Sequence, residues 1–235
     1  MGFINVSITP KAAAKLVLSG EIDLSERWGA VAAQEVLLAI SKLSIEDILE
    51  IIDSNPYGNV ADVKKIPQFG KLDTILKVPA IFFEKGLLCI DYPQLGFYLK
   101  RDVNATLVAN TKFGENHGKV ASVLGLIGCV DKRFVLSALT EAFYTADDEL
   151  KQRVLNRLWF RIPIVQILLK LAKDKVVSGY SPMEQLKEST MYRRGRSVHG
   201  ILNWLKTYNN DDLSRRIENV IWEDITGGEH ADDHN

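Results

Sequence analysis

Apolar residues recur at helical spacing along most of this chain, and no other feature of the sequence constrains its fold as strongly. Over residues 24–42, the apolar side chains that keep the i, i+3, i+4 spacing of an amphipathic helix are Trp28, Val31, Ala32, Val36, Leu37 and Ile40. From Gly114 the same pattern continues nearly to the end of the chain. The sequence therefore predicts a mainly α-helical protein.

One stretch departs from this pattern. Glu84-Lys85-Gly86 separates the apolar runs 81–83 and 87–90, an arrangement typical of a tight β-hairpin. We expect this hairpin within a helical N-terminal region that spans residues 1–110. That region is expected to serve dimerisation or to bind a partner subunit.

Composition excludes several classes of protein. The 235 residues are 46% hydrophobic, with 29 Lys and Arg against 30 Asp and Glu, which argues against a chain disordered throughout. Cys89 and Cys129 belong to no CxxC pattern, so we expect two buried apolar thiols and no metal site. No apolar run reaches the roughly 18 residues of a membrane span, and no signal peptide is evident, which predicts a cytoplasmic protein.

Charge is strongly segregated along the chain. Residues 151–206 hold twelve basic and three acidic side chains, whereas residues 207–235 hold two basic and eight acidic ones. Clustered Lys and Arg attract polyanions, so the basic block indicates a nucleic-acid partner, with a solvated helical surface as the alternative. The acidic tail 226–235 is expected to be disordered.

The basic block contains a helix-turn-helix pattern. Ser181-Pro-Met-Glu184 has the Ser-x-x-Glu spacing of a capping box, with Pro182 at the first helical position. After a short turn, Ser189 or Thr190 is placed to cap a second helix over about residues 190–206. We therefore expect a helix-turn-helix, winged-helix-like domain over residues 111–225.

The second helix has two unlike faces on a helical wheel. Its apolar face, expected to pack on the preceding helices, consists of Met191, Val198, Ile201, Leu202 and Leu205. The opposite face holds no acid and consists of Arg193, Arg196, Gly200 and Asn203, with Tyr192 and Trp204 on its flanks. Arg can grip guanine edges or phosphates and Asn can read adenine, so this face is expected to enter the major groove of DNA.

The expected DNA contacts divide into two kinds. The residues expected to read bases are Arg193, Arg196 and Asn203, beside Tyr192. The residues expected to hold phosphates are Lys151, Arg153, Arg157, Lys173, Lys175 and Arg194.

Two segments carry a resemblance to a known family. The first segment covers residues 190–205, ThrMetTyrArgArgGlyArgSerValHisGlyIleLeuAsnTrpLeu, and the second covers residues 113–127, PheGlyGluAsnHisGlyLysValAlaSerValLeuGlyLeuIle. Both resemble the winged-helix DNA-binding modules of bacterial restriction and other defence-system proteins. The similarity covers about residues 92–207 and includes no catalytic motif. It implies a recognition helix that bears Arg193 and Arg196.

A metal-dependent endonuclease is the first alternative. Asp53 followed by Asp62-Val-Lys64 has the spacing of the carboxylates and lysine that hold a catalytic Mg²⁺ in many nucleases, although the expected strand context is missing. The segment 114–120, GlyGluAsnHisGlyLysVal, resembles a phosphate-binding loop but departs from that motif in glycine spacing and in the Val after Lys. We therefore expect no nucleotide site there and keep Lys119 only as a candidate contact to a DNA phosphate.

These patterns together predict a double-stranded-DNA-binding protein rather than an enzyme. We expect a component of a restriction or defence system, as a homodimer or with a nuclease or methyltransferase subunit. No cofactor or membrane is expected, and Mg²⁺ only if the endonuclease alternative holds. A protein-interaction adaptor that binds no DNA is the second alternative.

Overall fold

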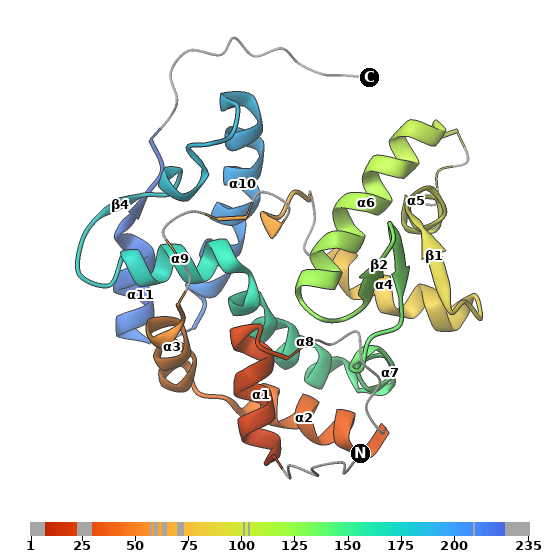
Figure 1. Cartoon of the computed structure of the whole chain (residues 1–235), viewed down its shortest axis with the longest axis horizontal. Helices are drawn as coiled ribbons and strands as arrows, with labels where there is room; N and C mark the ends of the chain where they lie inside the picture. The colour runs from red at the N-terminus through yellow and green to blue at the C-terminus, as the bar shows by residue number, and fades with distance from the viewer. Residues whose placement is uncertain are drawn as a thin grey trace, which may run out of the picture.

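The computed structural model describes residues 8–22, 30–56, 58, 61–62, 65–69, 73–100, 102, 104–208 and 210–223. Most of them lie in α-helices joined by short connections, and the strands are two or three residues long (Figure 1). The prediction of a mainly α-helical protein is confirmed.

Helices from both ends of the chain form one part of the molecule, called here the helical part (residues 8–56 and 148–223). Its N-terminal helices are α1 (Pro10–Ser19), α2 (Ala30–Lys42) and α3 (Ile45–Ser54). They pack against α8 (Asp148–Leu158), the 3₁₀ turn η2 (Trp159–Arg161) and α9 (Pro163–Leu171).

Side-chain caps set the starts of α3 and α8. The backbone N–H of Asp47 donates to Ser44 Oγ over 3.0 Å at the start of α3. Asp147 caps α8 in the same way, accepting from the N–H of Leu150 over 2.7 Å. Its neighbours Asp148 and Glu149 lie in the first turn, where the helix dipole favours acids.

The middle of the chain forms the sheet part (residues 73–145), drawn in yellow and green in Figure 1. Its helices are α4 (Asp73–Glu84), α5 (Tyr92–Lys100), α6 (Leu107–Val123) and α7 (Thr140–Thr145). The strands β1 (Cys89–Asp91), β2 (Gly128–Val130) and β3 (Arg133–Val135) form an antiparallel sheet with β3 in the centre. The expected domain boundary after residue 110 falls inside α6, which packs on α5.

The predicted hairpin at 81–90 is wrong. Residues 81–84 are the last turn of α4, and β1 pairs with β3 instead. The buried side chains Ile75, Val78, Ile81 and Phe82 recur at helical spacing, so packing holds this segment as a helix. The hairpin in this part is β2–β3, whose turn residues Asp131 and Lys132 have φ of 46° and 61°. Two central residues at positive φ are the turn geometry that twisted hairpins favour.

The C-terminal segment differs in detail from the predicted helix-turn-helix. In place of the first helix there is a single 3₁₀ turn, η3 (Ser181–Met183), and Ser181 Oγ donates to Ser178 O instead of capping. The second helix is present as α10 (Glu188–Leu205), but Lys187 is its N-cap and forms no side-chain cap bond. The capping roles predicted for Ser181, Ser189 and Thr190 are therefore wrong.

Two short strands flank α10. The chain after α10 forms α11 (Asp211–Glu218), and β5 (Val220–Ile221) then pairs in parallel with β4 (Val177–Ser178). A wing is an antiparallel hairpin, and these described strands do not form one. The winged-helix detail of the prediction is not confirmed.

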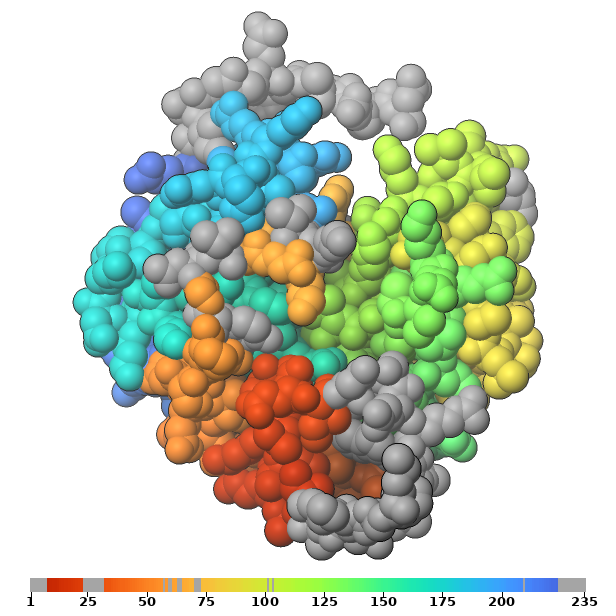
Figure 2. All heavy atoms as spheres, viewed as in Figure 1, coloured from red at the N-terminus to blue at the C-terminus, as the bar shows by residue number. Residues whose placement is uncertain are grey.

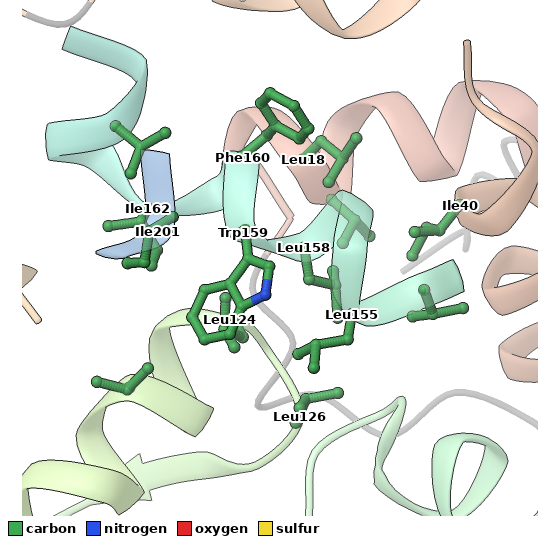
Figure 3. Close-up of a cluster of buried hydrophobic side chains, with 14 of the residues drawn as sticks. Leu18, Ile40, Leu124, Leu126, Leu155, Leu158, Trp159, Phe160, Ile162 and Ile201 are labelled. Carbon is green, nitrogen blue, oxygen red and sulfur yellow. The ribbon is translucent and has the colours of Figure 1, made fainter. Parts of the chain in front are cut away.

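One apolar core joins the two parts of the molecule. Trp159 is fully buried and stacks on Phe69 with ring centroids 5.8 Å apart. Leu124 from the sheet part and Ile201 on α10 belong to the same buried cluster as Trp159 (Figure 3). Arg161 Nη1 also donates to Val123 O over 3.0 Å, which fixes the end of α6 against η2. Helix α6 and helix α10 are thus held in place by the same core.

The predicted burial of the cysteines is wrong, since Cys89 and Cys129 are both exposed. They lie on β1 and β2, the outer strands of the three-stranded sheet. Short edge strands leave these positions open to solvent.

Candidate nucleic-acid interface

Helix α10 has the two faces that the sequence predicts. Val198, Ile201, Leu202 and Leu205 are at most 1% exposed, and Met191 packs against the core at its edge. On the opposite side, the exposed residues are Arg193, Arg196, Gly200 and Asn203. The apolar face anchors the helix, so its polar face is presented to solvent on a rigid support.

The guanidinium groups of this face are held by groups of α10 itself. Arg193 Nε donates to Ser189 O over 3.3 Å. Arg196 Nη2 donates to the Tyr192 hydroxyl over 2.8 Å, and its guanidinium carbon lies 4.4 Å from the centre of the Tyr192 ring. Among the described residues, no carboxylate forms an ion pair with either arginine. Both positive charges are therefore available to an anion.

The two glycines of α10 have different explanations. A Cβ on Gly195 would lie 2.5 Å from the Tyr180 ring, so close packing accounts for this glycine. A Cβ on Gly200 would meet nothing within 4 Å. At Gly200, therefore, no side chain projects from the exposed face of the helix.

A cleft opens beside this face, between α10 and α6. It has a volume of about 340 Å³ and is bounded on a third side by residues 65–68. Figure 2 shows the hollow between α10 in light blue and α6 in lime green. Its charged lining residues are Lys65, Lys112, Glu115, Lys119, Arg193 and Arg194.

Positive charge predominates in this cleft. Lys119 and Glu115 form an ion pair on α6, and among the described residues no carboxylate pairs with Lys65, Lys112 or Arg193. Arg194 Nη1 donates to Ile66 O over 2.7 Å. Burial, and then the charge of Arg193, lower the pKa of the Arg194 guanidinium from its ordinary value.

The other predicted phosphate contacts do not line this cleft. On α8, Lys151 pairs with Asp148 at 3.6 Å and Arg153 pairs with Glu149. Arg157 donates to the Tyr208 hydroxyl over 3.1 Å and stacks on its ring. Lys173 lies 2.7 Å from Asp53, and Lys175 is exposed beyond α9. A basic stretch of sequence is thus distributed over separate surfaces.

Sequence reasoning singled out Lys119 on the opposite wall but missed Lys112. Lys112 and Lys119 are seven residues apart on α6, a spacing that places both on one helical face. That spacing is a weak signal by itself, because nothing in the sequence places α6 beside α10.

The two candidate nuclease carboxylates, Asp53 and Asp62, do not line a common cleft. Asp53 accepts two hydrogen bonds from Arg216, of 2.6 and 3.1 Å, and one from Lys173, so both of its oxygens are occupied. It lines a second cleft between α3 and α11, which does not include the exposed Asp62. Lys64 lies outside the described residues. In the part of the chain that the structure describes, no group of three or more His, Cys, Asp or Glu is placed to hold a metal ion.

Comparisons with models of known protein families, with curated protein sequences and with solved structures found no match. Among the described residues, no helix is both long and apolar enough to cross a membrane.

Proposed function

We propose that this protein binds double-stranded DNA and that α10 is the element that lies in the major groove. The observation that supports this proposal most directly is the exposed face of α10, where Arg193, Arg196 and Asn203 share one side without an acidic partner among the described residues. Arg and Asn are the side chains that pair bidentately with guanine and adenine edges.

The dimensions of α10 suit this role. A helix with its side chains is about 10–12 Å across, and the major groove of B-DNA is about 12 Å wide. Arg193 and Arg196 lie in the first half of the 18-residue helix, and recognition helices contact base edges with residues near their N-termini. The resemblance to restriction and defence-system modules extends this proposal to a DNA-binding component of such a system.

Loss of both arginines is expected to weaken duplex binding. We expect Arg193→Ala/Arg196→Ala to lower the affinity for a 30-base-pair duplex by at least about tenfold and to reduce the slope of log K against log salt by about 2. Fluorescence anisotropy over a salt series measures both quantities.

The matched control is Lys42→Ala/Lys77→Ala, which removes the same charge from exposed positions on α2 and α4. It is expected to leave affinity and salt slope nearly unchanged. Equal affinity of the arginine variant and the wild type would remove α10 from the interface. No duplex binding by the wild type at low salt would favour the protein-interaction alternative.

A further inference from the structure

We propose that the cleft between α6 and α10 is a phosphate-binding site whose occupant is the backbone of the bound nucleic acid. In this arrangement Lys112 on α6 and Lys65 hold a phosphodiester group across from Arg193. The choice of occupant rests on the proposed function, whereas the phosphate site itself rests on the cleft alone.

The first support is the origin of the charges. Lys65, Lys112 and Arg193 come from three segments that are far apart in the sequence, and the fold places all three around one cavity. Lys65 and Lys112 are exposed, and no described carboxylate pairs with either of them. A cavity that gathers like charges gains from binding an anion, because the anion relieves their mutual repulsion.

The second support is the surface beneath those charges. Ile66, Pro67, Val120, Val123 and Ile162 form the apolar part of the lining. Charges beside an apolar surface are less screened by water, so their attraction for a phosphate is stronger than on an open helix. The uncharged polar groups available to a phosphate or sugar oxygen are the amides of Gln68 and Asn116.

The lining also indicates which portion of a nucleic acid enters. No aromatic side chain lines the cleft, so the stacking platforms that hold bases in single-strand sites are absent from its described lining. A volume of about 340 Å³ accommodates a phosphate with its sugar and is far too small for a duplex. The backbone ridge of a duplex held on α10 therefore fits the cleft better than an unpaired base does.

This arrangement gives α6 a role in binding. Helix α10 belongs to the helical part and α6 to the sheet part, so a backbone in the cleft contacts both parts at once. Phosphate contacts from α6 and from Arg193 set the position of the duplex, and Arg196 and Asn203 on the exposed face of α10 contact the bases.

The test uses the full chain, inorganic tripolyphosphate and the 30-base-pair duplex. We expect calorimetry to show that Lys112→Glu lowers tripolyphosphate affinity by at least about tenfold, as does Arg193→Ala. For the duplex, we expect Lys112→Glu to weaken binding and to reduce the salt slope by about 1. Lys77→Glu, the same charge reversal at an exposed position on α4, is expected to change neither ligand's affinity.

The outcomes separate the two proposals. If duplex affinity depends on Arg193 and Arg196 but neither ligand responds to Lys112→Glu, the phosphate site is overturned and the proposed function stands. If tripolyphosphate binding depends on Lys112 but the duplex does not bind at low salt, the phosphate site is supported and the proposed function is overturned. Circular dichroism confirms that each variant is folded, which the exposure of Lys112 leads us to expect.

Discussion

Replacement of Gly114 by alanine is expected to lower the free energy of unfolding by about 3 kcal/mol, at the upper end of the usual cost of overpacking. Gly114 is buried on α6 where this helix crosses α5. A Cβ there would lie 1.9 Å from Tyr92 O and 2.6 Å from Gly96 N. Both atoms belong to the backbone, so the added methyl group forces the two helices apart.

Gly200→Ala is the matched control for that prediction. Gly200 is also helical, but a Cβ there meets nothing within 4 Å. Alanine has the higher helix propensity, so this variant is expected to gain about 0.5–1 kcal/mol. Urea denaturation of both variants measures the two effects. A loss below about 1 kcal/mol for Gly114→Ala would contradict the close crossing of α5 and α6.

Close packing also explains the glycines in residues 114–120, the segment that resembles a phosphate-binding loop. Residues 114–120 lie within α6, and a Cβ on Gly118 would lie 2.1 Å from the Phe134 ring. The two glycines therefore permit close packing of α6 on α5 and on β3. His117 between them is 3% exposed and stacks on Phe113, and burial lowers the pKa of its imidazole from the ordinary value.

What the sequence predicts well is local. The apolar stripe of α10 and its exposed Arg193, Arg196 and Asn203 follow from residue spacing alone, because a helix repeats its faces every 3.6 residues. Capping by Ser44 is predictable for the same reason, since donor and acceptor are three residues apart. Such features depend only on residues within one or two turns.

Features that depend on distant contacts escape prediction. Residues 81–83 have β-forming side chains, yet they are helical because tertiary packing outweighs intrinsic strand preference. The β2–β3 turn lacks the usual Gly, and Asp131 and Lys132 adopt positive φ within a sheet that β1 completes. The cleft likewise requires α6 beside α10, and the core around Trp159 establishes that arrangement.

Replacement of Asp53 by alanine is expected to lower the free energy of unfolding by about 3 kcal/mol, the lower end of the range for breaking a buried ion pair. The Arg216 side chain is 2% exposed and donates two hydrogen bonds to Asp53. Its remaining acidic partner in the described structure is Asp212, at 2.9 Å. Without Asp53, the buried guanidinium of Arg216 loses one of its two acidic partners in the described structure. The remaining partner, Asp212, limits the loss of stability.

Asp148→Ala is the control, because this carboxylate is fully exposed and lies 3.6 Å from Lys151. Exposed pairs contribute about 0–1 kcal/mol, so this change is expected to have little effect. A similar loss of stability in the two aspartate variants would contradict a special role for the Asp53–Arg216 pair.

The contribution of Asp53 also has a defined pH dependence. Burial alone would raise the pKa of this carboxyl, but hydrogen bonds from Arg216 and Lys173 outweigh it and hold the pKa below its ordinary value. The stabilisation is therefore complete above a pH of about 4, the pKa of an unfolded aspartate, and is lost as the pH falls through the lowered folded value. In urea titrations between pH 7 and pH 2.5, the difference in unfolding free energy between wild type and Asp53→Ala is expected to shrink as the pH falls.

A second substitution at the same residue, Asp53→Asn, tests the endonuclease alternative, because a catalytic carboxylate and a structural one respond differently to substitution. If Asp53 were a ligand of a catalytic Mg²⁺, the wild-type protein would cleave plasmid DNA and Asp53→Asn would not. Because Arg216 and Lys173 already occupy its oxygens, we expect no magnesium-dependent cleavage by either protein and a lower unfolding free energy for the variant. Cleavage by the wild type that disappears in Asp53→Asn would show that metal chemistry, rather than the ion pair, determines the role of this residue.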